Sequence, residues 1–270
     1  MKIISHNING LNAYVKNNKL KQLMEEENAD IYCFQEVKCA NESKINSLLG
    51  DEILNEYNVY NSINTYKKGY AGVTTLVKKD INVKTVEIIN PSNTNLSGYA
   101  EGRLVIIEFD NFILLNLYNV NSGGEIKTKD RLIYDLWLIS YISVLQKIKP
   151  IILCGDLNVC LTEFDYWGNY KKAINSGPGL MNFEINALSM NVNHNKLIDG
   201  FRYLHGDERK YSWFTRGTKK SKQQPWESRH GWRLDYFILS EILKDRIDEC
   251  DIREAWNKVD HSPIILSIKF

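Results

Sequence analysis

Two polar motifs of this chain lie where short apolar runs meet loops. Gly-Asp-Leu-Asn at 155–158 follows the apolar run 151–154, and Asp-His-Ser-Pro at 260–263 precedes the run 264–266. Apolar runs of this length, bounded by turn-forming residues, are typical of buried β-strands. The two motifs therefore place carboxylate, carboxamide and imidazole groups at strand ends of a predicted α/β fold.

Two further apolar runs end in the same way. Gln35 and Glu36 follow the run 31–34, and Asn7 and Asn9 follow the run 3–4. Brought together, the four strand ends would suit a hard divalent cation that holds a phosphate while a water is activated.

The rest of the chain alternates strand-like runs with helical segments. The β-rich runs are 2–6, 30–35, 58–63, 72–77, 83–89, 104–109, 112–118, 150–154, 211–215, 232–239 and 263–269. Helical periodicity covers 16–27, 41–54, 128–148 and 180–188. In the longest of these segments, the predicted buried face is Leu132, Leu136, Ile139, Ile142 and Leu145. Because no linker or repeat divides the sequence, we expect one domain over 1–270, with helices flanking stacked sheets.

Composition narrows the class of protein. A chain of 270 residues with 43% hydrophobic content can build the core of one large domain. The formal net charge is only +1, so a site for a polyanion must be a local basic patch. The five cysteines lack C-x-x-C spacing, and we interpret them as reduced core thiols of an intracellular protein. We expect no signal peptide and no membrane-spanning segment.

Asp156 and Asn158 lie two residues apart, so in extended structure their side chains point the same way. The carboxylate can activate a water while the carboxamide orients that water or a phosphate. The same motif is also good turn chemistry, and the residues alone leave both interpretations open.

His261 needs a partner on its other ring nitrogen if it is to stabilise phosphate charge. Asp235 lies within the strand-like run 232–239 and is costly to bury unpaired, which makes it a candidate for that partner. The alternatives are a structural histidine, and a salt bridge of Asp235 with Arg233.

Glu36 and Asp260 offer the hard oxygen ligands that Mg²⁺ prefers, although Glu36 is equally understood as an ordinary loop carboxylate. Tyr118 ends the run 113–117, where its hydroxyl is either within reach of a phosphate or part of the core.

Three loops combine lysines with aromatic residues, at 67–70, 168–180 and 216–229. Such charge is commonly just solvated, but basic groups also bind phosphates, and rings stack on bases or sugars. We expect the lysines of 216–229 to add general affinity for a nucleic acid.

Eight motifs, taken in order, resemble the exonuclease III family of apurinic/apyrimidinic (AP) endonucleases, within the endonuclease/exonuclease/phosphatase superfamily. They are NINGL (7–11), QEVK (35–38), GYAGV (69–73), EGR (101–103), YNVN (118–121), GDLN (155–158), WRLDY (232–236) and DHSP (260–263). The resemblance covers essentially the whole chain. It implies a four-layered α/β sandwich, in which two packed mixed β-sheets are flanked by helices.

The resemblance also implies three groups of site residues. The catalytic group is Asp156, Asn158, His261, Asp235, Tyr118 and Asn7. The metal group, which would hold Mg²⁺ or Mn²⁺, is Glu36, Asn9 and Asp260. The DNA-binding group is a pocket for a flipped baseless sugar, from Trp213, Trp232 and Leu234, and backbone contacts from Tyr70, Arg103, Lys38 and Asn175.

Within the catalytic group, the resemblance gives Asp156 the activation of the attacking water and Asn158 its orientation. His261, backed by Asp235, would stabilise the charge on the phosphoryl oxygen. Tyr118 would contact the phosphate, and Asn7 would support the site.

Some positions depart from the family pattern. His6 stands where the family usually has an aromatic residue, and Asn119-Val120 replaces an apolar-Pro pair. The loop after Thr215 is longer than usual, so the residues that would wedge into DNA cannot be assigned through it.

The resemblance implies a Mg²⁺-dependent AP endonuclease of base excision repair. It would hydrolyse the phosphodiester 5′ to an abasic site in double-stranded DNA to leave a 3′-hydroxyl, with 3′-phosphodiesterase and 3′→5′ exonuclease activity alongside. The alternatives are a retrotransposon-type DNA-nicking endonuclease, which usually begins a longer polyprotein, and a non-catalytic DNA-binding homologue. We expect a monomer, cytoplasmic in a prokaryote or nuclear in a eukaryote.

Overall fold

The computed structural model describes residues 1–88, 101–123, 125–215 and 230–270. The lysine-rich loop 216–229 lies outside the described residues. Among the helices of the described part, none has the length and apolar character needed to span a membrane.

Two mixed sheets of six strands each form the centre of the molecule. The first has the order β13-β14-β1-β2-β4-β3, with β1 (Lys2–Asn7), β2 (Ile31–Gln35), β3 (Tyr57–Ser62), β4 (Val73–Lys78), β13 (Ile247–Ile252) and β14 (Ile264–Ile268). The second has the order β5-β6-β7-β8-β12-β9, with β5 (Val83–Ile88), β6 (Leu104–Phe109), β7 (Ile113–Tyr118), β8 (Ile151–Asp156), β9 (Leu197–Asp199) and β12 (Asp235–Ser240). The pairs β1–β2 and β7–β8 are parallel, and the other neighbours are antiparallel.

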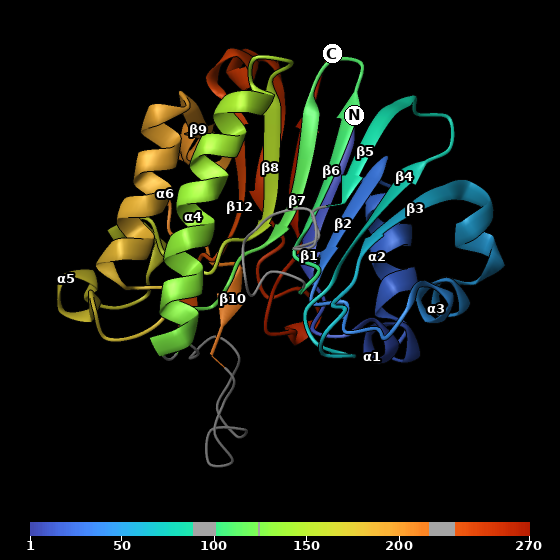
Figure 1. Ribbon diagram of the computed structural model, residues 1–270, viewed down its shortest axis with the longest axis horizontal. Helices are drawn as coiled ribbons and strands as arrows, with labels where there is room; N and C mark the ends of the chain where they lie inside the picture. The colour runs from blue at the N-terminus through green and yellow to red at the C-terminus, as the bar shows by residue number, and fades with distance from the viewer. Residues whose placement is uncertain (89–100, 124, 216–229) are drawn as a thin grey trace.

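Helices cover the outer face of each sheet (Figure 1). The first sheet is covered by α1 (Leu11–Lys16), α2 (Lys19–Glu27) and α3 (Glu42–Glu56), and the second by α4 (Glu125–Leu145) and α6 (Asn182–His194). Four short elements come between the larger ones along the chain: α5 (Tyr170–Ala173), α7 (Gly200–His205), β10 (Trp213–Phe214) and β11 (Gly231–Trp232). One apolar layer fills the space between the sheets, and one lies beneath each group of helices. The predicted four-layered sandwich is confirmed.

The central strands are buried on both faces. Every residue of β2, β7 and β8 is buried, because the other sheet covers one face and helices the other. This explains why these segments read as continuous apolar runs, without the alternation of a half-exposed strand. All five cysteines are free and buried, as predicted.

A few polar side chains join the two sheets beneath their shared end. Gln35 Nε2 donates to Asn116 Oδ1 across the interface at 2.7 Å, and to Ser5 Oγ at 3.0 Å. Asn116 Nδ2 in turn donates to Thr75 Oγ1 at 3.0 Å. Because buried polar groups are costly unless they are paired, these bonds fix one register of sheet on sheet.

The buried face of α4 differs from the prediction at two of its five positions. Leu132 and Leu136 are 38% and 58% exposed. Arg131 and Asp135 point inward one position earlier, with Arg131 Nε donating to Asp135 Oδ2 at 2.7 Å, and Tyr134 is buried beside them. The apolar periodicity takes no account of this buried ion pair, so in the first turns of the helix the predicted face is displaced by one residue, or about 100°. The remaining predicted positions are buried, as expected: Ile139, Ile142 and Leu145.

The strand predicted over 232–239 is also interrupted. β11 ends at Trp232, β12 begins at Asp235, and the intervening Arg233 side chain is buried among carboxylates. The edge strand β13 and the short helices α1, α5 and α7 were not predicted. These elements are short or half exposed, so they leave little apolar periodicity in the sequence.

Candidate active site

Strand direction brings the polar motifs to one end of the sandwich. The parallel strands β1 and β2 end there at Asn7 and Gln35, and β7 and β8 end there at Tyr118 and Asp156. The strands β12 and β14 run the other way and begin there. This end lies opposite the two chain termini (Figure 1).

Asp156 is fixed by donors from both sheets. Asn7 Nδ2 donates to Asp156 Oδ2 at 2.9 Å, and the backbone N–H of Asn158 donates to Asp156 Oδ1 at 2.9 Å. Asn7 Nδ2 also donates to Glu36 Oε1 at 2.9 Å and so ties the two carboxylates together. Gly155 is required just before, because a Cβ there would lie 1.9 Å from the carbonyl oxygen of Leu117.

His261 is paired with Asp235 as predicted. The two side chains meet through His261 Nδ1 and Asp235 Oδ2 at 2.9 Å, and Ser212 Oγ donates to the same oxygen at 2.7 Å. His261 Nε2 lies 3.8 Å from Asp156 Oδ2. Arg233 pairs elsewhere, with Asp165 and Asp199, which removes it as the partner of Asp235.

Burial and charge set the ionisation of this pair. Burial raises the pKa of Asp156, helped by the charge of Asp235. Burial alone would lower the pKa of His261, but the charges of Asp235 and Asp156 raise it well above its usual value. The geometry therefore favours an imidazolium that donates from Nδ1 to Asp235 and presents Nε2–H towards Asp156.

Asn158 is held in one orientation. Its Nδ2 donates to the carbonyl of Asn119 at 2.9 Å, and Asn121 Nδ2 donates to its Oδ1 at 3.3 Å. Asn121 was not assigned a role from the sequence, although it belongs to the YNVN motif. Asn119, where the family pattern has an apolar residue, is buried and bonded through Nδ2 to Asp135 at 3.0 Å.

Lys38 lies against the predicted metal group. Its Nζ is 2.5 Å from Glu36 Oε2 and donates to Asn9 Oδ1 at 2.5 Å, and Asn9 Nδ2 donates to Asp260 Oδ2 at 3.0 Å. Burial alone would raise the pKa of Glu36, but the bonds from Lys38 and Asn7 lower it below its usual value. Glu36 and Asn9 thus each direct an oxygen at the Lys38 ammonium, and Asp260 is linked to Asn9. Oxygen donors grouped in this way fit a hard cation such as Mg²⁺.

A second grouping of donors overlaps the first. Single ligand atoms of Glu36, Asp156 and His261 lie within 4.8 Å of one another and could hold a metal ion. Only Glu36 is common to this grouping and the predicted metal group.

Four residues of the site have a left-handed backbone conformation. Asn9, Glu36, Lys38 and Asn158 have φ angles of 49°, 51°, 54° and 51°. Non-glycine residues rarely adopt this conformation, which costs about 1–3 kcal/mol each and persists only where surrounding contacts impose it. The fold thus holds these side chains in fixed positions at a cost in stability.

Tyr118 borders the site, and Arg103 supports it from behind. Burial raises the pKa of Tyr118 well above its usual value, helped by the charges of Glu36 and Asp156, so its hydroxyl remains a donor. The guanidinium of Arg103 lies 4.7 Å from the Tyr118 ring centroid and pairs with Glu101. Arg103 is only 3% exposed, which argues against the direct DNA-backbone contact predicted for it.

An aromatic wall faces the polar groups. Trp213 and Trp232 pair in register between β10 and β11, with ring centroids 5.3 Å apart and an interplanar angle of 66°. These rings and Leu234 border a pocket of about 510 Å³ that is also lined by Asp156, Asn158, His261 and Tyr118, and by the metal group with Lys38. Pro178 and Gly179, which sequence reasoning missed, complete its rim, and Gly179 leaves room for the ring of Trp232.

A buried charge network holds the corner that carries Trp232. Arg233 Nε donates to Asp165 Oδ1 at 2.7 Å, and its Nη2 lies 2.5 Å from Asp199 Oδ2. Arg202 also pairs with Asp165, and the Arg233 backbone N–H donates to the Asp165 carbonyl at 2.8 Å.

Replacing Asp165 with Asn is therefore expected to lower the free energy of unfolding by about 3–5 kcal/mol, because Arg233 stays buried with one carboxylate fewer. Urea denaturation checks this. The matched control is Asp248→Asn, which breaks an exposed pair with Lys269 and should cost at most about 1 kcal/mol. Equal losses in the two variants would contradict the account.

Two predicted DNA contacts lie outside the pocket. Tyr70 sits among cations, with Lys67 Nζ 4.8 Å and Lys127 Nζ 5.7 Å from its ring centroid. Asn175 has a φ of 63°, and its Oδ1 accepts from the Asn182 backbone N–H at 2.9 Å.

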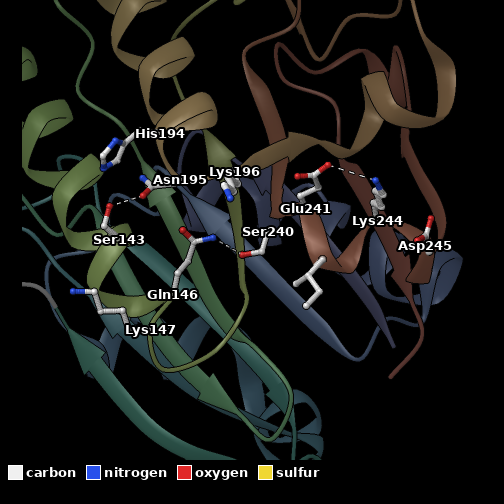
Figure 2. A pocket seen from close by; sticks show the side chains of 11 residues that line it. Ser143, Gln146, Lys147, His194, Asn195, Lys196, Ser240, Glu241, Lys244 and Asp245 are labelled. Atoms are coloured by element: carbon white, nitrogen blue, oxygen red, sulfur yellow. Dashed lines mark hydrogen bonds and ion pairs between the residues drawn. The ribbon is translucent and has the colours of Figure 1, made fainter.

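A larger pocket lies away from the predicted site. Figure 2 shows this pocket of about 1010 Å³, beside the ends of α4 and α6. Its polar side chains largely bond to one another: Gln146 Nε2 donates to Ser240 Oγ at 2.8 Å, and Lys244 pairs with Glu241 at 3.4 Å. None of the predicted site residues lines it.

The chain matches known proteins over almost its entire length. A model of the family described as Endonuclease/Exonuclease/phosphatase matches residues 4–250. Exodeoxyribonucleases of Bacillus subtilis and Streptococcus pneumoniae are 33% and 32% identical, each over 99% of both chains. The DNA repair nuclease APEX1 of Danio rerio is 33% identical over 98% of this chain and 81% of its own.

Solved structures share the fold. An AP endonuclease from Leishmania major has a TM-score of 0.84 at 23% identity, covering 100% of this chain and 87% of its own. A 3′-5′ exonuclease from Neisseria meningitidis has a TM-score of 0.82 at 19% identity, covering 100% of both chains. On the family match and the relatives of similar sequence, this chain belongs to the endonuclease/exonuclease/phosphatase family.

Proposed function

We propose that this protein is a metal-dependent AP endonuclease of base excision repair, which cuts double-stranded DNA 5′ to an abasic site. The observation that carries the proposal is that Asp156 and the Asp235-backed His261 share one pocket with Trp213 and Trp232. A proton acceptor, a cationic donor and an apolar wall are what hydrolysis beside a baseless sugar requires. The relatives named as exodeoxyribonucleases and a DNA repair nuclease support this assignment.

The proposed hydrolysis uses Asp156 as the base. It accepts a proton from a water whose oxygen attacks the phosphorus, and Asn158 orients that water. The bond from phosphorus to the 3′-oxygen breaks, and the departing oxygen takes a proton from solvent to become a 3′-hydroxyl. His261 Nε2–H and the Tyr118 hydroxyl donate to the phosphoryl oxygens, where negative charge accumulates.

A bound Mg²⁺, or Mn²⁺ in its place, would supply Lewis-acid stabilisation of the phosphoryl oxygen. We propose Glu36, Asn9 and Asp260 as its ligands, because all three offer hard oxygens. We prefer this set to the one that includes His261, because an imidazolium held by Asp235 has no lone pair for a metal.

The aromatic wall is proposed to distinguish abasic sites from intact DNA. A flipped baseless sugar fits against Trp213, Trp232 and Leu234, and the cost of flipping, a few kcal/mol for a paired base, is lower where the base is missing. Lys38, Tyr70 and Asn175 are proposed as backbone contacts, with Arg103 holding Tyr118. The same hydrolysis of a phosphodiester, at the 3′ end of a DNA strand, accounts for 3′-phosphodiesterase and 3′→5′ exonuclease activity. A monomer that acts on cellular DNA, in cytoplasm or nucleus, fits this activity.

Nicking of a duplex that carries one tetrahydrofuran abasic analogue tests the proposal, beside an undamaged duplex of the same sequence, with and without Mg²⁺. We expect Mg²⁺-dependent internal cutting at the analogue in the abasic duplex, and no internal cutting of the undamaged duplex. Equal cutting of both would favour a retrotransposon-type endonuclease, and no cutting of either would favour a non-catalytic homologue.

Glu36→Gln is expected to raise the Mg²⁺ concentration for half-maximal nicking by about tenfold or more, because Mg²⁺ is held by few protein carboxylates. DNA affinity should change less. A Mg²⁺ titration of nicking, with Mn²⁺ binding measured by calorimetry, checks this. Glu241→Gln in the larger pocket is the control, and an unchanged half-saturation point in Glu36→Gln would place the metal elsewhere.

Trp232→Ala is expected to weaken binding of the abasic duplex by about tenfold or more, because it removes the apolar surface against which the flipped sugar packs, at roughly 1.5–3 kcal/mol for a large apolar side chain. Binding of the undamaged duplex should be nearly unchanged, because only a flipped sugar meets this ring. Fluorescence anisotropy measures both affinities. Trp167→Ala removes a nearby exposed ring outside the pocket and serves as control, with melting curves for all three proteins. Equal loss on both duplexes would contradict the assignment.

A further inference from the structure

His6 is a buried imidazole that the proposed chemistry leaves without a role. It is 1% exposed and lies on β1, one residue before Asn7. Its Nε2 is 2.9 Å from the carbonyl oxygen of His261, and its Nδ1 is 3.0 Å from the hydroxyl of Tyr14. One ring therefore joins α1 to the backbone of the residue that faces the phosphate.

The directions of the two bonds follow from their chemistry. A carbonyl oxygen can only accept, so Nε2 carries the proton and donates to His261. Burial lowers the pKa of His6 to about 4, so near neutral pH the ring is uncharged and Nδ1 accepts from the Tyr14 hydroxyl. Both ring nitrogens are thus used, each in one role.

The bond to His261 completes a set of three that hold the backbone of 260–262. The Phe214 N–H donates to the Asp260 carbonyl at 2.8 Å, and the Ser262 N–H donates to the Ser212 carbonyl at 2.6 Å. The partners in both of these bonds belong to or adjoin β10. The bond from His6 comes from β1, and it is made to the residue whose imidazole must stay aimed at the pocket.

Neighbouring rings fix the orientation of His6. Trp256 meets it edge to face, with centroids 5.6 Å apart and an interplanar angle of 88°, and Tyr14 meets it at 5.3 Å and 79°. A polar hollow of about 160 Å³ borders His6, Tyr14, Asn9 and Asp260. A smaller side chain at position 6 would therefore open the His261 carbonyl towards this hollow.

We propose that His6 is a positioning residue, whose Nε2–H bond to the His261 carbonyl sets the aim of the His261 imidazole at the scissile phosphate. The proposal rests on the role of His261 in the proposed function. A phenyl ring at this position would have no donor for the His261 carbonyl, which the Nε2–H of His6 supplies.

Two amide substitutions separate this bond from simple packing. The Gln side-chain nitrogen reaches the position of Nε2, and His6→Gln is expected to keep kcat and KM on the abasic duplex within about threefold. The Asn amide reaches only the position of Nδ1, and His6→Asn should lower kcat about tenfold at unchanged KM, close to the net value of one hydrogen bond. Tyr14→Phe removes the other bond of the ring and should leave kcat within about threefold.

The second readout is independent of nuclease activity. The proton on His261 Nδ1, shared with Asp235, gives a downfield NMR resonance, which should persist in His6→Gln and shift or broaden in His6→Asn. Melting temperatures of the two variants should fall together, because both lose the ring. The proposal is overturned if Gln and Asn lower kcat equally, if Tyr14→Phe falls as far as His6→Asn, or if the resonance is the same in all variants. A protein that does not cut abasic DNA would refute the proposed function, while the resonance would still report whether His6 holds His261.

Discussion

Replacing His261 with Ala is expected to lower the single-turnover rate of abasic-site cleavage by about 10³-fold, the value of a donor aimed at developing charge in a closed site. The reason lies in its surroundings. His261 Nδ1 is anchored to Asp235 at 2.9 Å, and the pKa of His261 is raised by the two nearby carboxylates. Its Nε2 lies 3.8 Å from Asp156 Oδ2, and both residues line the pocket. The variant removes a fixed positive donor without removing any proposed metal ligand.

Rapid-quench measurement of nicking and anisotropy measurement of DNA binding separate chemistry from affinity in this variant. Binding should remain close to that of the wild type, since the imidazole acts on the phosphoryl oxygens in the transition state. His194→Ala, at an exposed histidine beside the larger pocket, is the control. A His261→Ala rate within tenfold of wild type would show that the charge is stabilised by other groups.

Asp156→Asn is the second large effect, with an expected loss of at least about 10³-fold, from the loss of a general base and of its negative charge. The substitution keeps the shape of the side chain. Asp156 accepts from Asn7 on one oxygen and from the Asn158 N–H on the other. An amide has only one oxygen, so its NH₂ group must face one of these donors, which disturbs the site as well as removing the base.

The comparison that isolates the base is Asp156→Asn against Asn7→Ala, which removes one donor and leaves the carboxylate. We expect Asn7→Ala to lose much less activity. Single-turnover rates with saturating Mg²⁺ and melting curves for both variants make the comparison. Equal rates for the two would mean that geometry around Asp156, and not its carboxylate, limits the reaction.

The end of the sandwich at which the site forms could be predicted from the sequence. Asp156 and Glu36 each lie two residues after an apolar run, and His261 lies three residues before one. The ends of parallel neighbouring strands lie at the same edge of a sheet, so strand direction alone brings the polar residues at these ends together. A carboxylate in an apolar strand needs a partner, which left His261 and Arg233 as candidates for Asp235, and the family resemblance favoured His261.

The contacts that could not be predicted are those set by distant parts of the chain. Asp165 and Asp199 lie far apart in sequence, and nothing local marks them as partners of Arg233. Arg103 was expected to contact the DNA backbone but is buried behind Tyr118, because its contacts with Glu101 and with the Tyr118 ring are made only in the folded protein.

The helix α4 shows that apolar periodicity also fails to identify charged residues that are buried as a pair. Its buried face passes through Arg131 and Asp135, which satisfy each other and so can enter the core. An apolar pattern assigns such residues to the surface, and Leu132 and Leu136 were placed inside in their stead. Charged pairs in a core are visible only when both partners are known to meet.

Isotope labelling of the cleavage products tests the central claim most directly. The abasic duplex is cut in H₂¹⁸O with Mg²⁺, and both new ends are analysed by mass spectrometry. If water attacks the phosphorus and the 3′-oxygen leaves, one ¹⁸O appears in the 5′-phosphate of the baseless sugar, and the other end is an unlabelled 3′-hydroxyl. A 3′-phosphate, a 3′-unsaturated aldehyde, or a label in the 3′-hydroxyl would contradict the account.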